Sequence, residues 1–268
     1  MSDSSIITLM TDFGDRDAYA GSMKGVILSV DPDIKIVDIT HQAAPFNLAS
    51  AAYILSTYYA LYPPGTVHVA VVDPGVGGPR APIAVAAGGY YFALPDNGLL
   101  TMVLDACKDG CRARLIENPE LIREDVSATF HGRDIFAPAA ARLATGFPFD
   151  EVGPPILRPA ALESAKLSVS ANAIAGSAVH IDHYGSYITN ITEERMSRFE
   201  GPPLLVRIGS FTIMGLSRTF TDKQQGELLA YIGSTGHLEI AVSRGSARES
   251  IGLPAGAEVT VRWRDSAG

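Results

Sequence analysis

Short apolar runs alternate with longer amphipathic stretches along the first 150 residues of the chain. The runs are rich in β-branched residues, which predicts strands. They cover residues 6–10, 34–39, 67–72 and 83–86. Because helix-compatible stretches separate them, the pattern is typical of strands joined by crossover helices. We therefore expect an α/β domain over residues 1–152.

Two helices are expected within this domain. Residues 48–61 are apolar nearly all round and follow Asn47, a favourable N-cap, so they should form a buried helix. Residues 134–144 should form another. Pro138 is tolerable there only if it lies in the first turn of that helix.

The second part of the chain has a different pattern. Four prolines between residues 147 and 159, together with Gly153, cannot continue a helix or a central strand, and we expect a linker over residues 153–170. Beyond it, short apolar runs are separated by Gly, Ser and Pro. They cover residues 177–181, 204–208, 228–231, 238–242 and 258–263. The predicted fold class is an α/β N-terminal domain plus an all-β, barrel-like C-terminal domain over residues 171–268.

Composition narrows the classes of partner. The 268 residues carry a net charge of -8, and no basic stripe suited to phosphate backbones is present, so neither nucleic acid nor an anionic membrane is expected as a partner. No apolar stretch reaches the roughly 18 residues of a membrane span, and the polar opening Met1 to Ser5 does not have the pattern of a signal peptide. A cytoplasmic location is expected.

The two cysteines, Cys107 and Cys111, are spaced four residues apart. A zinc site needs about four ligands, and no second Cys or His cluster stands near them. We expect two reduced thiols, and no metal site.

The first candidate for chemistry is Asp12, which directly follows the first strand. Ligand crevices form at the carboxyl ends of strands in α/β sheets, and a carboxylate there can hold both hydroxyls of a ribose. Asp12 could instead be the N-cap of the following helix. The triplet Asp12-Phe13-Gly14 also occurs in kinases, but the glycine-rich loop and the other kinase motifs are missing.

Three further residues stand in turn-forming sequence. Asp73 ends a β-branched run, and the Pro-Gly and Gly-Gly pairs after it force a turn that brings Arg80 back toward it. His131 precedes Gly132 in a polar turn where an imidazole has no packing reason to be. Each could be structural alone, but together they indicate an active site.

At these blocks the chain resembles the S-adenosylmethionine (SAM) hydroxide adenosyltransferases, relatives of the SAM-dependent chlorinase and fluorinase. The resemblance covers nearly the whole chain. Its motifs are Thr11-Asp12-Phe13-Gly14, Asp73-Pro74-Gly75-Val76-Gly77 with Arg80, Asp96-Asn97-Gly98-Leu99-Leu100, Thr129-Phe130-His131-Gly132-Arg133-Asp134, residues 181–190 and Gly245-Ser246-Ala247.

The resemblance implies hydrolysis of SAM to adenosine and methionine by a homotrimer whose active sites lie where one subunit's first domain meets another's second. Asp73, Arg80 and His131 would be the catalytic residues that handle the attacking water, and Asp12 would bind the ribose. SAM would be the substrate, with no separate cofactor. The sulfonium is an excellent leaving group, so the reaction needs a nucleophile held in line rather than an acid.

The resemblance also implies residues that bind the substrate. Asp182 would receive the methionine ammonium, Tyr184 would pack on the ligand, and Phe46 would present its ring to the ribose. Ser186 stands where the family more often has an asparagine that bonds the adenine, so this contact should be weaker or bridged by water.

Three further positions are matched through the segment 233–239 and the strand after it. Ser234 and Glu239 would lie near the ligand, and Val242 would offer backbone atoms to the adenine edge. A Gly-Ser turn and a strand glutamate are also ordinary in small barrels.

Other functions stay open on the sequence. A halide adenosyltransferase is one, because Gly132 fits the chlorinase, whereas the fluorinase has a serine there and an aromatic hydroxyl in place of Asp73. The Asp73 carboxylate would repel a halide, which favours hydrolysis. A metallohydrolase using Asp12, Asp73 and His131 is the second, and a SAM-binding protein without turnover is the third. His68, His180 and His237 carry no motif and are expected to be structural.

Overall fold

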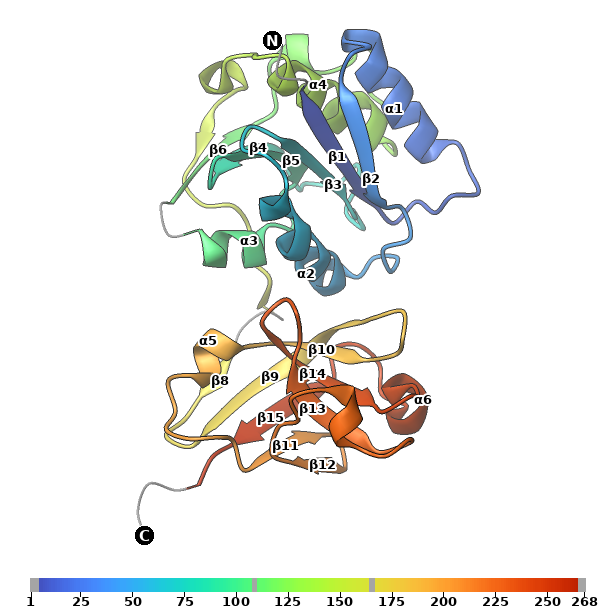
Figure 1. The fold of residues 1–268 in the computed structure, drawn as a ribbon. Coiled ribbons are helices and arrows are strands. Elements are labelled where there is room, and N and C mark those ends of the chain that lie inside the picture. The colour runs from blue at the N-terminus through green and yellow to red at the C-terminus, as the bar shows by residue number, and fades with distance from the viewer. Residues whose placement is uncertain (1–4, 108–109, 164–166, 265–268) are drawn as a thin grey trace. The chain divides into compact units, whose positions relative to one another are not determined.

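The computed structural model describes residues 5–107, 110–163 and 167–264, which divide into two compact units, Met1–Leu162 and Glu163–Gly268. Two short strands lie within residues 153–170, the stretch expected to be a linker: β7 (Pro155–Ile156) and β8 (Ser168–Val169). Each unit is described by itself below (Figure 1).

The N-terminal unit is built on a seven-stranded sheet in the order β2-β1-β3-β5-β4-β6-β7. Its other strands are β1 (Ile6–Thr11), β2 (Lys35–Thr40), β3 (Val67–Val71), β4 (Pro82–Ala87), β5 (Tyr90–Pro95) and β6 (Cys111–Leu115). The pairs among β1, β2, β3 and β5 are parallel, whereas β4 runs antiparallel to both β5 and β6. The four predicted strands are therefore confirmed, and the sheet is mixed.

The expectation that crossover helices join all these strands is wrong for the segment from β3 to β5. The chain passes from β3 to β4 through the turn that carries Asp73, without a helix. It then passes from β4 to β5 through Gly88 and Gly89 alone, both at positive φ. A two-residue glycine turn of this kind makes a hairpin and imposes antiparallel pairing.

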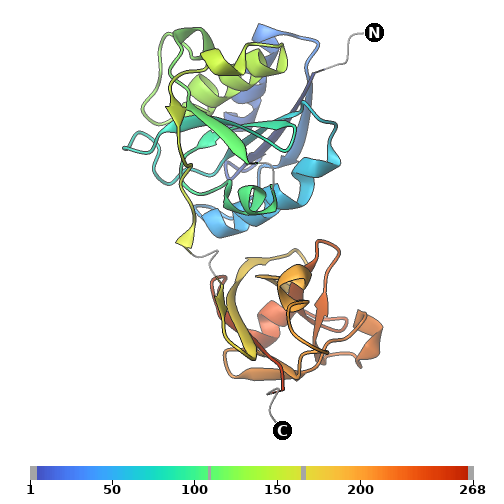
Figure 2. The same ribbon diagram turned by 90° about the vertical axis from the view of Figure 1, so that its left-hand side faces the viewer.

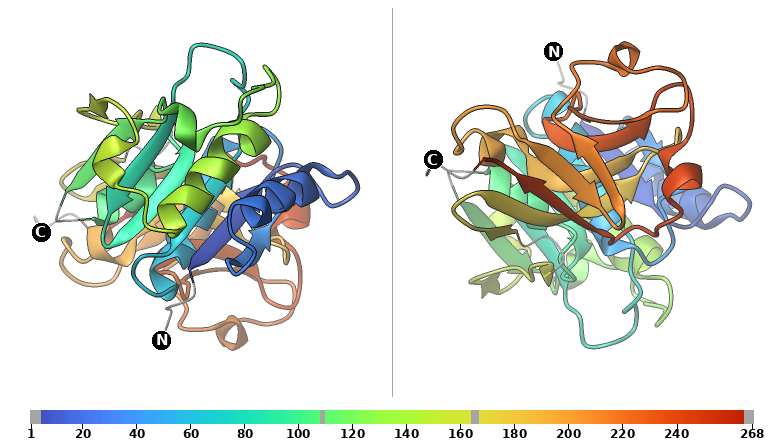
Figure 3. Two further views of the ribbon diagram at one scale, coloured as in Figure 1. Left: turned by 90° about the horizontal axis from the view of Figure 1, so that it is seen from above. Right: turned by 90° about the horizontal axis from the view of Figure 1, so that it is seen from below.

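Helices cover both faces of this sheet (Figures 1 and 2). They are α1 (Tyr19–Val30), α2 (Leu48–Tyr58), α3 (Thr101–Ala106) and α4 (Ala137–Ala144). Helices α1 and α4 lie side by side on one face (Figure 3), where Ile7 and Leu9 of β1 meet Met23 and Ile27 of α1. Met10 belongs to the separate core on the other face, which α2 and α3 cover. Side chains alternate along β1, so this strand contributes residues to the cores on both faces of the sheet.

Both predicted helices are present with the expected terminal features. The Asn47 side chain accepts a hydrogen bond from the backbone N–H of Ser50 at 3.1 Å, and a 3₁₀ turn (Tyr59–Leu61) continues α2. Pro138 lies in the first turn of α4, as the sequence requires. A π-helical turn (Gly132–Phe136) precedes α4, and His131 is its N-cap.

The C-terminal unit is an all-antiparallel, nearly closed sheet in the order β12-β11-β15-β9-β10-β14-β13, with β8 beside β9. Its remaining elements are β9 (Ala173–Ile181), β10 (Tyr187–Thr192), α5 (Glu193–Met196), β11 (Leu205–Ile208), β12 (Phe211–Met214), β13 (Leu228–Ile232), β14 (His237–Val242), α6 (Ala247–Ile251) and β15 (Glu258–Arg262). The two end strands approach each other, and the Ser217 N–H donates to the Ala230 carbonyl at 2.8 Å. The predicted barrel-like domain is confirmed.

Cys107 is half-buried and Cys111 is exposed, and both are free thiols. Across residues 5–107, 110–163 and 167–264, no helix combines the length and apolar character needed to cross a membrane.

Candidate active site

The turn after β3 brings Asp73 and Arg80 together, as its glycines and prolines predict. Arg80 Nε donates to Asp73 Oδ1 at 3.0 Å, and Arg80 Nη2 donates to Asp73 Oδ2. The two side chains are only 9% and 5% exposed, so the pair is shielded from water. A bidentate contact of this kind fixes the plane of the guanidinium.

His131 completes a three-residue cluster with this pair. Its Nδ1 lies 2.7 Å from Arg80 Nη2. Because a guanidinium only donates, Nδ1 must accept, and the neutral ring carries its proton on Nε2. Burial and the Arg80 charge hold the pKa of His131 below its ordinary value of 6.5, although the negative charges of Asp73 and Asp134 oppose them. His131 is therefore a neutral imidazole near pH 7.

Arg80 has one end left without a protein partner. Its Nη1 is buried, yet no acceptor among the described residues bonds to it. Asp73 and His131 engage Nε and Nη2, and the Phe136 ring lies 5.6 Å from the Arg80 Cζ. Buried donors almost always have an acceptor, so this end of the guanidinium is suited to a small oxygen ligand such as water.

Asp12 lies beyond β1, and its carboxylate organises a second loop. The Phe46 N–H donates to Asp12 Oδ2 at 3.1 Å, although the two residues are far apart in sequence. Helix α1 has Ala18 as its N-cap, so the alternative assignment of Asp12 as that cap is wrong. The other carboxylate oxygen, Oδ1, has no such backbone contact in the hydrogen bonds described.

Phe46 is held in an unusual conformation. Its φ is +61°, in the left-handed region that non-glycine residues rarely adopt, and its side chain is 72% exposed. Such strain persists only where neighbouring contacts impose it, and it concentrates at ligand sites. The hydrogen bond to Asp12 is one such contact, and it leaves the aromatic ring in the open.

His41 holds the segment around Asp12 through contacts with the residues on either side of it. Its Nδ1 lies 2.9 Å from Thr11 Oγ1, and its Nε2 lies 3.1 Å from Asp38 Oδ1. The His41 carbonyl also accepts from the Gly14 N–H at 2.6 Å. His41 is buried, and through these contacts it holds the loop that carries Asp12.

In the C-terminal unit, four of the predicted substrate-binding residues line one hollow of about 340 Å³. They are Asp182, Tyr184, Ser186 and Val242. Asp182 Oδ1 accepts the Ser186 N–H at 2.7 Å, which holds the acid beside the residue that is expected to contact the adenine. Tyr184 is 78% exposed, so its ring is available to a ligand.

Three residues of this hollow were not predicted as site residues: Phe220, Arg244 and Gly245. The Phe220 ring packs on Tyr231 at 4.8 Å, and a capping box of Thr219 and Asp222 fixes its backbone. Arg244 has a φ of +53°. The Thr219-to-Asp222 spacing was a readable turn signal, but nothing in the sequence showed that the turn borders the hollow.

Glu239 and Ser234 do not line this hollow. Glu239 is buried, accepts a hydrogen bond from the Tyr231 hydroxyl, and has a pKa raised by burial. A Cβ on Gly233 would lie 1.9 Å from Glu239 Oε1, so the glutamate fits only beneath a glycine. Ser234 is exposed in the turn between β13 and β14.

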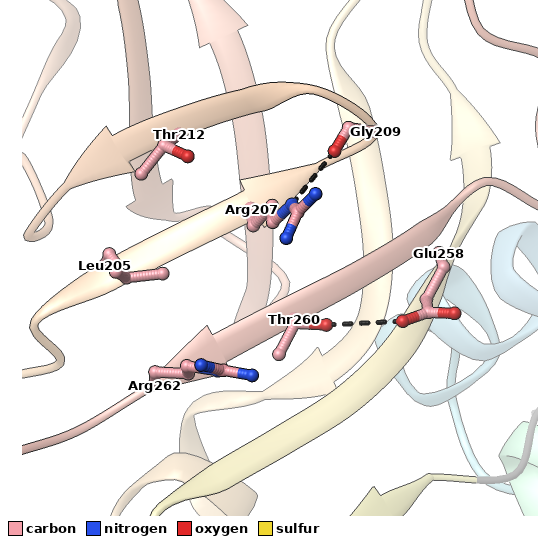
Figure 4. Close-up of a pocket in the computed structure, with 7 residues that line it drawn as sticks. All are labelled: Leu205, Arg207, Gly209, Thr212, Glu258, Thr260 and Arg262. Atoms are coloured by element: carbon pink, nitrogen blue, oxygen red, sulfur yellow. Dashed lines mark hydrogen bonds between the residues drawn. The ribbon is translucent and has the colours of Figure 1, made fainter.

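A larger hollow, of about 510 Å³, lies on β11, β12 and β15 (Figure 4). Its polar lining residues are Arg207, Thr212, Glu258, Thr260 and Arg262. Most of these side chains are exposed, which makes ion pairing among them weak. It contains none of the predicted site residues, and we do not assign it a ligand.

The orientation of the side chains that could bind a metal does not favour a metallohydrolase. Asp73 and His131 both direct their acceptor atoms at the Arg80 guanidinium, which holds the place that a metal cation would take. Among residues 5–107, 110–163 and 167–264, no group of three or more His, Cys, Asp or Glu side chains could bind a metal ion.

The fold and the site define a class of protein: an α/β domain with a buried Asp–Arg–His cluster, followed by a β-barrel domain with a hollow of its own. Family models for the SAM hydroxide adenosyltransferase N-terminal and C-terminal domains match residues 7–153 and 176–260. The chain belongs to this family.

Named relatives agree with this assignment. The chain is 36% identical to an (R)-S-adenosyl-L-methionine hydrolase of Salinispora tropica, over 95% of this chain and 97% of that one. It is 37% identical to the hydrolase of the same name from Thermus thermophilus, over 94% and 98%. A fluorinase from an Actinoplanes species is 29% identical over 96% and 97%.

A crystal structure of an uncharacterized conserved protein from Thermotoga maritima superposes with a TM-score of 0.86 at 36% identity, covering 96% of this chain and 100% of that one.

Proposed function

We propose that this protein hydrolyses S-adenosyl-L-methionine to adenosine and L-methionine, by attack of water or hydroxide on the ribose C5′. The similar hydrolases support the substrate, and the Asp73–Arg80–His131 cluster supports the chemistry. These hydrolases are named for the (R) form of the substrate, so we propose the same epimer here.

The buried Nη1 of Arg80 is the observation that carries this proposal. A water oxygen that accepts from this nitrogen would lie beside a permanent positive charge, shielded from solvent. That charge lowers the cost of forming hydroxide, and the fixed guanidinium needs no rearrangement as the charge develops. The C5′–O bond forms as the C5′–S bond breaks, so methionine departs as a neutral thioether and no acid is required. The proton that the water loses is released to bulk solvent.

Binding of the substrate is divided between the two units in this proposal. Asp12 and Phe46 would hold the ribose, and Asp182 with Tyr184, Ser186 and Val242 would hold the methionine ammonium and the adenine. Glu239 would act through Tyr231 rather than by touching the ligand.

We further propose a cytoplasmic homotrimer in which one subunit's first domain and another's second complete each active site. Size-exclusion chromatography with light scattering tests the assembly, and cell fractionation tests the location.

The activity test incubates purified protein with the (R) and (S) sulfonium epimers separately, with and without EDTA and excess chloride. Liquid chromatography with mass spectrometry follows adenosine, methionine and 5′-chloro-5′-deoxyadenosine. Equal amounts of adenosine and methionine, unaffected by EDTA or chloride, are expected. A chlorinated nucleoside would support the halide transferase, and loss of activity in EDTA would support a metal enzyme. Intact SAM retained on the protein would indicate binding without turnover.

A further inference from the structure

Asp134 is a fully buried carboxylate three residues after His131, with cationic and backbone partners on several sides. Arg133 donates to it through Nε at 2.7 Å and Nη2 at 2.8 Å, and Arg123 Nε lies 3.2 Å away. Its exposure is 0%. Burial raises the pKa of Asp134, but hydrogen bonds from Arg133 and Ser127 and the nearby positive charges outweigh burial and lower it, so the group is ionised.

These contacts close the segment that leads into His131. Residues 123–130 contain no regular helix or strand. The Arg123 N–H donates to the Asp134 carbonyl at 2.9 Å, and the Ser127 N–H donates to Asp134 Oδ2 at 2.9 Å. A single residue therefore fixes both the start and the middle of an irregular loop.

The same loop contacts the turn that carries Asp73 and Arg80. Gly77, at φ +75°, approaches so closely that a Cβ there would lie 2.4 Å from the Ala128 carbonyl oxygen. Ala128 directly follows the Ser127 that Asp134 holds. A displacement of this loop would thus move His131 and the Arg80 turn relative to each other.

We propose that Asp134 is a positioning residue of the proposed hydrolysis. It sets the 123–131 loop so that His131 Nδ1 stays within reach of Arg80 Nη2 and the guanidinium keeps Nη1 directed at the nucleophile. It touches neither the substrate nor the cluster directly. This inference rests on the proposed function for the expected change in kcat. The placement of His131 against Arg80 can be measured without turnover.

The test compares Asp134→Asn and Asp134→Glu with a matched control, Asp150→Asn. Asp150 is an ion-paired aspartate of the same unit that is 65% exposed. Asp134→Asn removes the charge at nearly constant shape, and Asp134→Glu retains the charge. We measure kcat, KM and the pH–rate profile with (R)-SAM, adenosine affinity by calorimetry, and thermal unfolding.

Asp134→Asn is expected to lower kcat by about 10- to 100-fold, because small misplacements at a reacting centre have effects of that size. KM and adenosine affinity should change less than about twofold, because the substrate contacts lie elsewhere. The acid limb of the pH–rate profile should shift to lower pH, because the Asp134 charge raises the pKa of His131. Asp134→Glu should recover part of kcat, and Asp150→Asn should match the unaltered protein.

Nitrogen-15 NMR of the histidine rings gives a readout that does not depend on activity. Unaltered protein should show neutral His131 with its proton on Nε2, and Asp134→Asn should lose this single tautomer. If the protein shows this NMR behaviour but does not hydrolyse SAM, the proposed function fails and the positioning role stands. If Asp134→Asn lowers only the melting temperature, with kcat and the His131 resonances unchanged, Asp134 is merely structural and the proposal is wrong.

Discussion

At the scale of the residue, Arg80 combines a permanent positive charge with a planar guanidinium whose orientation is fixed by Asp73. Replacement by Lys keeps the charge but loses the paired contact with Asp73 and the donor at Nη1. We expect Arg80→Lys to lower kcat by about 10²- to 10³-fold, the usual effect of removing one preorganised donor. Steady-state kinetics checks this, with Arg112→Lys, an exposed arginine of the same unit, as control. A kcat within about threefold of normal would show that charge alone suffices.

His131 gives a prediction about pH. Its pKa lies below 6.5 because burial and Arg80 disfavour the protonated ring, and protonation would end its contact with Arg80 Nη2. Activity should therefore be constant through neutral pH and fall only as pH drops through this lowered pKa. A kcat profile between pH 4.5 and 8.5 measures it. An acid limb centred above pH 6.5 would contradict the environment described for His131.

The sequence predicted Asp73, Arg80 and His131 as a group because each stands in turn-forming sequence beside an apolar run. It could not show that Asp134 holds the His131 loop or that Phe220 borders the hollow. Those roles depend on contacts that no motif in the sequence pairs, such as that of Phe220 with Tyr231.

At the scale of the element, the turn after β3 and the 123–131 loop depend on Gly77. Gly77→Ala would place a side chain in the left-handed region and against the Ala128 carbonyl. We expect a loss of about 1–3 kcal/mol in the free energy of unfolding, together with a lower kcat. Gly65→Ala is the control, because Gly65 has a φ of +87° but no atom within 4 Å of the place that a Cβ would take. Urea denaturation measures the cost of backbone strain, which both substitutions share, and kinetics measures displacement of the catalytic residues, which only Gly77→Ala should cause. Equal effects of the two substitutions on kcat and on the free energy of unfolding would contradict the role given to Gly77.

Element types were more predictable than their pairing. Apolar runs located β1 to β4 because buried strands need them, and Asn47 marked the start of α2 because its side chain replaces a missing backbone partner. The mixed sheet was missed although the signal was present: Gly88-Gly89 between β4 and β5 specifies a hairpin. The pairing of β4 with β5 is thus determined by the local turn and not by the overall alternation of strands and helices.

At the scale of the whole molecule, His68 makes stability depend on pH. It is fully buried beside Thr8, and burial lowers its pKa from 6.5 to about 4. The unfolded chain therefore takes up a proton at a higher pH than the folded one. Stability is unaffected by this group above pH 6.5 and falls by about 3 kcal/mol as pH drops from 6.5 to 4.

Chemical denaturation at pH 7.5 and pH 5 checks this, with His68→Gln as the variant that cannot titrate. The variant should lose less stability over this interval than the unaltered protein, whatever its stability at pH 7.5. The only tryptophan, Trp263, lies in the C-terminal unit, so circular dichroism rather than tryptophan fluorescence must follow the unit that contains His68. Parallel pH dependences in the two proteins would contradict the prediction.

The proposed sharing of each active site between two subunits makes a further prediction for the assembly. Asp73→Ala and Asp182→Ala should each be inactive as pure proteins, because each removes one domain's contribution. Co-expression of the two should restore part of the activity, since some sites would then combine two intact domains from different subunits. Activity measured on the purified mixed assembly tests this. No recovery in a verified mixed trimer would place each site within one chain.

Gly132 lies in the π-helical turn before α4, where a Cβ would come within 3.2 Å of Met23 Sδ and 3.3 Å of the Phe13 ring. A side chain at this position would therefore press on a methionine sulfur and an aromatic ring, and either neighbour would have to shift by a small amount. Any lineage that acquires a side chain at this position has to accommodate it against Met23 and Phe13, so exchanges at these three positions should be coupled. Ancestral reconstruction along such a branch should find exchanges at Met23 or Phe13 together with the change at Gly132.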